Sequence, residues 1–295
     1  MLKLVLPTGS LEKPTLEMFE AADLPVTCLN SRSYRGEIDD PRISSICFMR
    51  PQEIPVYVAE GLFNMGICGL DWVMERQCLE RVVQMAVLPY SRSTNKAVKI
   101  VVAVHKDSGI EAPEQIPPGS KVTTEYVHLA TEYFRKLGIP VRVEFSFGTT
   151  EAKVPEMADV AVELTERGTT LRANNLRIID VIAESQTVLI TNPESYADKE
   201  IRMEMEAIKT LLMGAVEARG KVLLKLNVAK DSLEEVLRIM PALKAPTVAQ
   251  LYSSDSGYFA VESVVAKQGI NVLIPQLLDA GAEDILVLPI TKIIR

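Results

Sequence analysis

The chain has few aromatic residues and no long apolar run. Aromatics make up 5% of its 295 residues, with 15 glycines and 17 prolines, 47% hydrophobic and 24% charged residues. These levels argue against fibrous and disordered classes and favour a soluble globular protein of two or three domains. No stretch approaches the roughly 20 apolar residues that cross a bilayer. The N-terminal MLKLVLPTGSLEKP has no signal-peptide apolar segment. We therefore expect a cytoplasmic protein without a membrane partner.

Cysteine, histidine and positive charge are also scarce. The two histidines, His105 and His128, lie far in sequence from cysteines that show no CxxC spacing, so we expect reduced, buried thiols rather than a zinc site. The 39 acids exceed the 32 bases, and the net charge of −7 disfavours a nucleic-acid partner. A small anionic substrate remains compatible, because a few arginines in a cleft create a local positive field. The cysteines are Cys28, Cys47, Cys68 and Cys78.

Strand and helix patterns alternate along the first 200 residues. This alternation predicts α/β architecture with largely parallel sheets, arranged as two lobes with a ligand cleft at the carboxyl ends of the strands. No Ser/His/Asp pattern and no Walker A loop is present. The expected strands are 2–6, 26–29, 46–49, 65–68, 100–104, 121–124, 141–145 and 159–164, and the expected helices are 11–22, 53–60 and 128–137.

The last third of the chain has a different pattern. A long amphipathic helix is expected at 198–219, because its apolar residues recur on one stripe. The order of elements that follows is strand, helix, strand, strand, helix, strand, which is the ferredoxin-like βαββαβ arrangement. Such a domain would serve oligomerisation or bind an effector. The expected elements are 221–228, 232–240, 248–252, 258–265, 272–280 and 284–290.

The segment 158–182, ADVAVELTERGTTLRANNLRIIDVI, is the most informative part of the chain. A short apolar strand runs into Glu163, a glycine and three threonines, and a helical pattern begins near Leu171. Backbone N–H groups at a helix start, with Gly168 allowing close approach, suit the phosphate of a phosphorylated sugar, while an acid accepts hydrogen bonds from ribose hydroxyls. The alternative is an ordinary strand-to-helix turn with a threonine N-cap.

Three other segments carry weaker signals. Arginines 32, 35, 42 and 50 could bind a pyrophosphate bidentately, or could form exposed pairs with acids such as Asp39 and Asp40. TTEYVHL at 123–129 follows a strand and opens a helix, as the segment 158–182 does. GTTEAKV at 148–154 allows a tight turn that would point Glu151 toward a cleft.

Taken together, these segments resemble ATP phosphoribosyltransferase in its long form, the first enzyme of histidine biosynthesis. The resemblance covers essentially the whole chain. Its blocks are RSYRGEIDDPRI (32–43), RPQEIPVYVAEG (50–61), GICGLDW (66–72), TTEYVHL (123–129), ELTERGTTLRANNLRIID (163–180), KAPTV (244–248) and AGAEDILVLPITKII (280–294).

The resemblance implies a catalytic unit like a type II periplasmic binding protein, followed by a ferredoxin-like regulatory domain. Its divisions would be 1–97 with 182–215 for the first catalytic lobe, 98–181 for the second and 216–295 for the regulatory domain. Adenine N1 of ATP would attack C1 of phosphoribosyl pyrophosphate, and Mg²⁺, held mainly by substrate, would accompany the diphosphate. The family forms dimers or hexamers that histidine inhibits at the C-terminal domain.

The resemblance also implies site residues, all of which position groups and none of which is assigned a catalytic proton transfer. On the phosphoribosyl pyrophosphate side they are Glu163, Thr165, Glu166, Arg167, Gly168, Thr169 and Thr170. On the ATP and pyrophosphate side they are Gly9, Arg32, Arg50, Glu125, Tyr126 and Glu151. The expected allosteric residues are Thr247, Ala280 and Ala282.

The chain departs from the family at several positions. Thr8 and Ser10 stand where the family has basic residues, so two positive charges near the substrates are missing. Val127 and Asn175 replace a proline and a glycine, and Arg167, which replaces a glycine, could restore charge at the phosphate. The rival hypotheses are a non-catalytic nucleotide or amino-acid sensor on the same scaffold, and a regulatory subunit that needs a partner.

Overall fold

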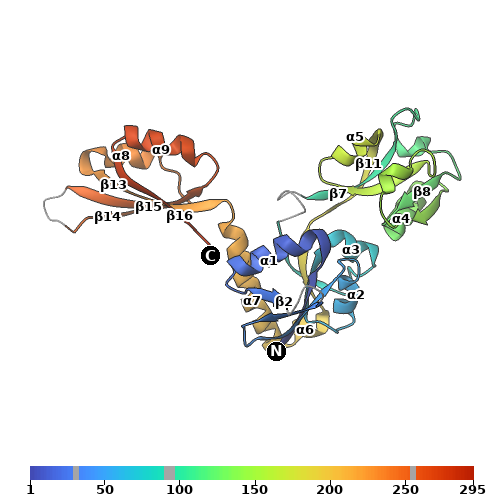
Figure 1. Ribbon diagram of the computed structural model, residues 1–295, viewed down its shortest axis with the longest axis horizontal. Coiled ribbons are helices and arrows are strands. Elements are labelled where there is room, and N and C mark those ends of the chain that lie inside the picture. Colours follow the sequence, from blue (N-terminus) through green and yellow to red (C-terminus); the bar gives the residue numbers. More distant parts are fainter. Residues whose placement is uncertain (29–32, 90–96, 253–256) are drawn as a thin grey trace. The chain divides into compact units, whose positions relative to one another are not determined.

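A computed structural model describes residues 1–28, 33–89, 97–252 and 257–295. Its contacts divide the chain into two compact units, Met1–Lys209 and Thr210–Arg295. The first unit contains a seven-stranded and a five-stranded sheet, and the second a four-stranded sheet (Figure 1). None of the helices in the described ranges combines the length and apolar character that a membrane span requires.

The seven-stranded sheet and its helices form what we call the first lobe. Its central strand β1 is buried along almost its whole length, as expected for a strand covered on both faces, and pairs in parallel with β4 and β5. In sheet order the strands are β2 (Val26–Cys28), β3 (Arg35–Ile38), β4 (Ile43–Met49), β1 (Leu2–Pro7), β5 (Met65–Gly69), β12 (Thr187–Thr191) and β6 (Val83–Leu88). The helices are η1 (Gly9–Leu11), α1 (Glu12–Ala21), α2 (Ile54–Ala59), α3 (Leu70–Glu75), α6 (Pro193–Ala197) and the first half of α7 (Lys199–Ala218), whose residues from Thr210 on belong to the second unit.

The five-stranded sheet and its helices form the second lobe. Strand β10 pairs in parallel with β8 and antiparallel with β7, and its apolar side chains join a core with α4. In sheet order the strands are β11 (Leu176–Ser185), β7 (Val98–His105), β10 (Val160–Thr165), β8 (Lys121–Thr124) and β9 (Arg142–Phe145). The helices are η2 (Pro113–Gln115), α4 (Val127–Leu137), η3 (Thr150–Lys153) and α5 (Thr169–Ala173).

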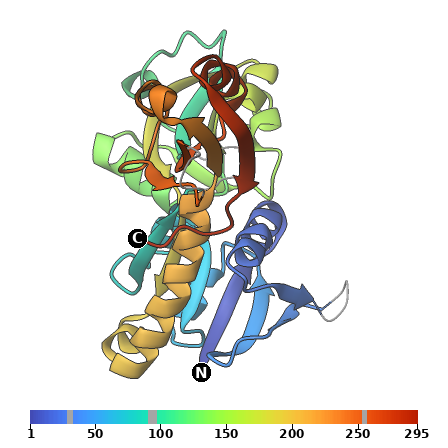
Figure 2. The same cartoon turned by 90° about the vertical axis from the view of Figure 1, so that its left-hand side faces the viewer.

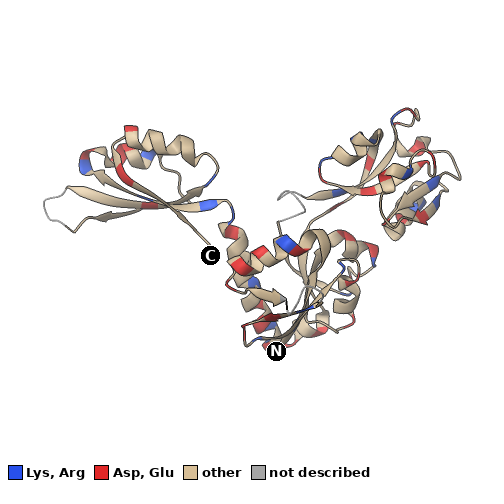
Figure 3. Cartoon of the chain, in the orientation of Figure 1, with Lys and Arg blue, Asp and Glu red and all other residues tan. Residues whose placement is uncertain are grey.

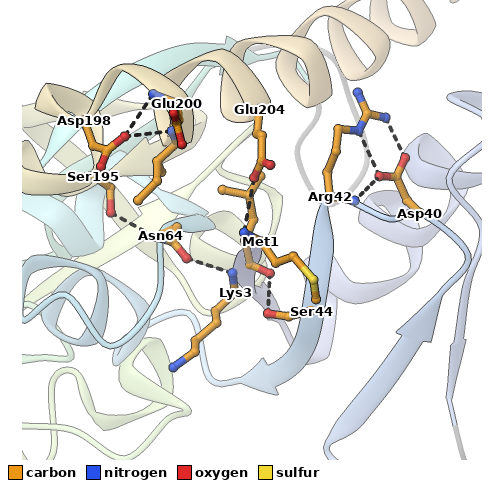
Figure 4. A network of polar contacts seen from close by, with 12 residues as sticks. Met1, Lys3, Asp40, Arg42, Ser44, Asn64, Ser195, Asp198, Glu200 and Glu204 are labelled. Atoms are coloured by element: carbon orange, nitrogen blue, oxygen red, sulfur yellow. Dashed lines mark hydrogen bonds and ion pairs between the residues drawn. The ribbon is translucent and has the colours of Figure 1, made fainter.

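The chain returns to the first lobe one residue after β11. Strand β12 pairs antiparallel with both β5 and β6, which makes the sheet mixed rather than largely parallel as the alternation predicted. Polar contacts then hold α6 and the start of α7 beside β1 (Figures 2 and 4). Asn64 accepts a hydrogen bond from the Lys3 backbone N–H at 2.8 Å and donates one to Ser195 Oγ at 3.0 Å. The Met1 amino group forms an ion pair with Glu204 at 3.5 Å.

Two sheets, with the chain crossing from the first to the second and back, give the architecture of type II periplasmic binding proteins. The boundaries expected at 181/182 and 215/216 fall inside β11 and α7. The division of the chain into two catalytic lobes and a regulatory domain at these boundaries stays a prediction.

The second unit has the expected βαββαβ order. Its sheet is antiparallel throughout, and α8 and α9 cover one face, burying residues such as Leu224, Val236 and Leu277 (Figure 1). In chain order the elements are β13 (Lys221–Ala229), η4 (Lys230–Ser232), α8 (Leu233–Ile239), β14 (Thr247–Gln250), β15 (Tyr258–Ala266), α9 (Ile270–Asp279) and β16 (Ala282–Pro289). The sheet order, β14-β15-β13-β16, is that of a ferredoxin-like domain.

A helix lies where the pattern near Leu171 predicted one, but it is short. Helix α5 covers five residues and ends at Ala173, after which Asn175 has a φ of 58° and turns the chain. The following run LRIIDVIAES is strand β11, paired antiparallel with β7. Its β-branched isoleucines and valine favour a strand, and pairing with the buried strand β7 stabilises it; this strand was not predicted. Strands β3, β6 and β12 and helices α3 and α6 were also not predicted.

Candidate active site

A cavity of about 950 Å³ lies within the first unit and is lined by residues of both lobes. From the first lobe come the turn after β1, the segment after β4 and the start of α3. From the second lobe come the turn after β8, the residues around η3 and the end of β10. Six of the predicted site residues meet there: Gly9, Arg50, Glu125, Tyr126, Glu151 and Glu163.

Glu163 has a strongly shifted pKa in this cavity. Its pKa is raised to about 7, mainly by burial and also by the nearby carboxylates of Glu125 and Glu151, while a hydrogen bond with Thr150 opposes the shift. The Leu164 backbone N–H donates to its Oε1 at 3.1 Å. Carboxylates with such pKa values gather at functional sites, because a ligand that supplies hydrogen bonds or positive charge restores the ionised form.

The lining of the cavity is acidic. Among the described lining residues the acids outnumber the bases by six to one, whereas over the ribbon as a whole the two signs are interspersed (Figure 3). An anionic ligand would therefore need a cation to offset its repulsion from these carboxylates. The acids are Glu12, Glu53, Asp71, Glu125, Glu151 and Glu163, and the base is Arg50.

Two first-lobe residues of the site, Asp71 and Trp72, were not predicted. The Asp71 carboxylate accepts from Tyr126 Oη at 2.8 Å and from Ser185 Oγ at 2.5 Å, and its own N–H donates to Ser185 at 2.9 Å. The rings of Trp72 and Tyr126 stack with centroids 4.7 Å apart. Burial and Asp71 raise the pKa of Tyr126 well above its usual range, so the phenol stays a donor. The available signal was an acid two residues after the buried strand β5, similar to the strand-end acid that singled out Glu163.

The turn after β1 forms part of the first-lobe wall. The Thr8 backbone N–H donates to the Met49 carbonyl at 2.8 Å, and the Gly9 N–H faces the Glu12 carboxylate at 3.3 Å. Gly9 has a φ of 76°, which favours glycine. With Thr8 and Ser10 in this turn, its side chains add no positive charge to the cavity.

The predicted phosphate segment lies beside the cavity rather than in its lining. In this turn the Gly168 N–H donates to Thr165 Oγ1 at 2.8 Å, and Gly168 has a φ of 66°. Arg167 is exposed, as are Thr169 and Thr170, while Glu166 is partly buried. Because α5 is a single short turn, its dipole is a weak source of phosphate affinity.

The arginines of the region around 32–50 do not form one cluster. Arg42 pairs with Asp40, which lowers the pKa of that carboxyl, and Arg35 is exposed on β3 (Figure 4). Of the three described arginines, Arg50 lines the cavity. Arg32 lies outside the described residues. Arg42 therefore fits the alternative interpretation, in which these arginines pair with nearby acids.

The structure separates the three predicted allosteric residues. Thr247 begins β14, whereas Ala280 and Ala282 flank the turn into β16. Strands β14 and β16 are the two edges of the sheet, with β15 and β13 between them. One copy of the domain therefore does not bring all three residues together.

Both histidines and three of the cysteines lie among the described residues. His128 Nδ1 lies 2.8 Å from Gln77 Nε2, and His105 lies beside Asp107, so both histidines have ordinary polar partners. The described cysteines Cys47, Cys68 and Cys78 form no disulfide.

These features define a class: a two-lobed α/β ligand-binding unit whose cavity collects residues at strand ends of both lobes, followed by a small ferredoxin-like domain. Comparison with known proteins narrows the class. The model of the ATP phosphoribosyltransferase family matches residues 50–214, and that of the HisG C-terminal domain matches residues 218–292. The chain belongs to the ATP phosphoribosyltransferase family.

Individual relatives agree with this assignment. ATP phosphoribosyltransferase of Pelotomaculum thermopropionicum is 42% identical over 99% of both chains, and that of Desulforudis audaxviator is 43% identical, also over 99% of both. A solved structure, the ATP phosphoribosyl transferase (HisG:HisZ) complex from Thermotoga maritima, matches with a TM-score of 0.61 at 25% identity, covering 72% of this chain and 99% of that one.

Proposed function

We infer that the chain catalyses the first step of histidine biosynthesis: it transfers the phosphoribosyl group of phosphoribosyl pyrophosphate to N1 of the ATP adenine, giving phosphoribosyl-ATP and pyrophosphate. The observation that carries this inference is the convergence of Glu163 from the second lobe with Arg50 and Gly9 from the first in one cavity. In that arrangement each lobe can bind one of the two reactants. The reaction itself is inferred from membership of the family.

The chemistry asks for positioning more than for proton transfer. As pyrophosphate leaves, C1 acquires oxocarbenium character, so the enzyme must align the adenine nitrogen and neutralise the departing charge. Glu163 would hold the ribose hydroxyls, with the turn Thr165–Thr170 at the 5′-phosphate. Arg50 and the Glu125–Tyr126 turn would face the ATP and pyrophosphate side.

Mg²⁺ fits the donor chemistry of this cavity. Hard divalent cations prefer oxygen ligands, and six carboxylates line the space. Substrate diphosphate would provide most of the ligands, because Mg²⁺ is usually bound through one or two carboxylates together with substrate phosphates. Bound there, Mg²⁺ would neutralise charge on the diphosphate that Arg50 does not offset.

The second unit would carry feedback inhibition by histidine in a cytoplasmic homo-oligomer. Because Thr247 and the pair Ala280 and Ala282 occupy opposite sheet edges, a site that uses all three requires the β14 edge of one copy to meet the β16 edge of another. This supports an oligomer, dimer or hexamer, in which effector binding and assembly are linked.

The non-catalytic sensor is the weaker alternative. Thr8 and Ser10 favour it, but relatives named as the enzyme match over the full chain. The partner-dependent subunit is also disfavoured, because this chain carries its own C-terminal domain at residues 218–292.

A turnover assay tests the proposal. Incubation with ATP, phosphoribosyl pyrophosphate and Mg²⁺ should give phosphoribosyl-ATP, and added histidine should lower the rate. Calorimetry with each substrate, run in parallel, separates the alternatives: binding of both substrates without turnover at high concentration would identify a sensor, and turnover excludes it.

A further inference from the structure

Helix α4 of the second lobe begins without an N-cap of its own. Its N-cap residue Tyr126 makes no side-chain cap hydrogen bond, and the first turn contains no acidic residue. The first backbone N–H groups of a helix have no acceptor inside the helix and must find one elsewhere. The start of α4 lies directly after Glu125 and Tyr126, which line the cavity. Whatever caps this helix therefore also fixes part of the site.

Glu75, the last residue of α3 in the first lobe, provides both acceptors. Its Oε1 accepts from the His128 backbone N–H and its Oε2 from the Leu129 backbone N–H, each at 2.9 Å. These are charge-assisted hydrogen bonds to the positive end of an eleven-residue helix. Burial raises the pKa of Glu75, and the two N–H donors oppose that shift.

The rest of α3 contacts the same turn. Asp71 accepts the Tyr126 hydroxyl and Trp72 stacks on the Tyr126 ring, so three residues on one short helix hold one turn of the other lobe. Asp71 and Trp72 line the cavity, but Glu75 does not. An effect of Glu75 on the reaction must therefore be transmitted through the turn.

We propose that Glu75 is a positioning residue: by capping α4 across the two lobes it holds the turn after β8 so that Glu125 and Tyr126 face the cavity. The consequence for ATP rests on the proposed assignment of this turn to the ATP side. The capping itself rests on the hydrogen bonds alone.

The experiment compares Glu75→Ala and Glu75→Gln with a matched control, Glu60→Gln. Glu60 is also an acid at a helix end of the first lobe, but it is exposed and does not line the cavity. Trp72 is the one tryptophan of the chain, so acrylamide quenching of its fluorescence reports the contact with Tyr126 without any need for turnover. Steady-state kinetics supply KM and kcat for both substrates.

For Glu75→Ala we expect stronger Trp72 quenching and a KM for ATP about fivefold to tenfold higher, the scale of losing a helix cap. The kcat and the KM for phosphoribosyl pyrophosphate should stay within about twofold, because uniform binding of one substrate is lost. Glu75→Gln keeps one acceptor and should fall between Ala and the wild type. The control should match the wild type in every readout.

A lower melting temperature with an unchanged KM for ATP would make Glu75 merely structural and overturn the proposal. So would a raised KM with Trp72 quenching unchanged. If Glu75→Ala does not fold, Glu75→Gln carries the same comparison. Absence of turnover in the wild type would remove the proposed reaction instead, and ATP affinity by calorimetry together with the quenching series would then decide the role of Glu75.

Discussion

Two turns of the second lobe, after β8 and after β10, start from the same sequence pattern and end differently. The strands are parallel neighbours, and in each a threonine hydroxyl accepts a backbone N–H of the turn at 2.8 Å, Thr124 from Tyr126 and Thr165 from Gly168. The first turn opens an eleven-residue helix capped from the other lobe. The second opens five helical residues and relies on a left-handed glycine.

The difference shows why one turn at the end of a strand lines the cavity and the other does not. The turn after β8 lines the cavity because α3 holds it there, whereas the turn after β10 contributes to the lining through the residues at the strand end, Glu163 and Leu164. A threonine and a helix start are common to both. The cap that Glu75 gives to α4 is what the turn after β8 adds to this common pattern.

The largest effect is expected from Glu163→Gln. This variant tests whether β10 contributes to substrate binding through the residue at its end. Loss of charged hydrogen bonds to two ribose hydroxyls should lower kcat/KM for phosphoribosyl pyrophosphate about 100-fold. In the wild type the same parameter should fall below about pH 7, where Glu163 becomes protonated. Rate against pH for wild type and variant checks both, with the exposed Glu156→Gln as the control.

The stability of the same variant should change in the opposite direction. The folded pKa of about 7 exceeds the usual 4.5, so the stability linked to protonated Glu163 is complete below about pH 4.5 and is lost as the pH rises through about 7. Glu163→Gln should therefore be more stable than the wild type above pH 7, on the order of 1–3 kcal/mol. Equal unfolding free energies across pH 4–8 would contradict the assigned burial.

Next in size is Gly168→Val, compared with Gly138→Val. Both glycines are left-handed, with φ of 66° and 70°, so both variants should lose on the order of 2 kcal/mol of stability. A Cβ at Gly168 would also lie 3.1 Å from the Arg172 guanidinium, whereas Gly138 has open space. We expect calorimetry to show lost phosphoribosyl pyrophosphate binding for Gly168→Val and retained binding for Gly138→Val. Equal affinities would remove the turn after β10 from the site.

A smaller and opposed pair of effects is expected from Thr124→Val and Thr165→Val. Thr124 is fully buried, so its loss leaves the Tyr126 N–H without an acceptor and should cost about 1–3 kcal/mol in unfolding free energy. Thr165 is partly exposed, water can replace it, and the cost should stay below about 1 kcal/mol. Thr165→Val should raise the KM for phosphoribosyl pyrophosphate severalfold, and Thr124→Val the KM for ATP. Identical profiles would mean that the two turns are equivalent.

The smallest expected effect is an increase in substrate affinity. Ser10→Arg adds a base to the acidic cavity where the family has one, and should lower the KM for one of the two anionic substrates about twofold to fivefold at low salt, less at high salt. Ser10→Gln controls for size without charge. An equal change in both variants would show that charge on the first-lobe wall does not limit affinity.

Sequence reasoning reached the strand-end residues of the site but not their supports. The strand-end pattern singled out Glu163, and the family resemblance implied Glu125, Tyr126 and Glu151. Glu75 was not predicted, because its role depends on the start of a helix 53 residues away. Strand β11 was missed for the same reason, because it depends on pairing with β7, which lies far away in the sequence.

By itself the sequence determined the α/β class, the ferredoxin-like order of the last domain, the family resemblance and the strand-end acids, because each follows from local periodicity or from ordered blocks. The tertiary structure decided which charges share a cavity, that Arg42 is taken up by Asp40, and that Thr247 is separated from Ala280 and Ala282. These depend on which distant segments pack together, and the pKa of a carboxylate such as Glu163 depends on that packing.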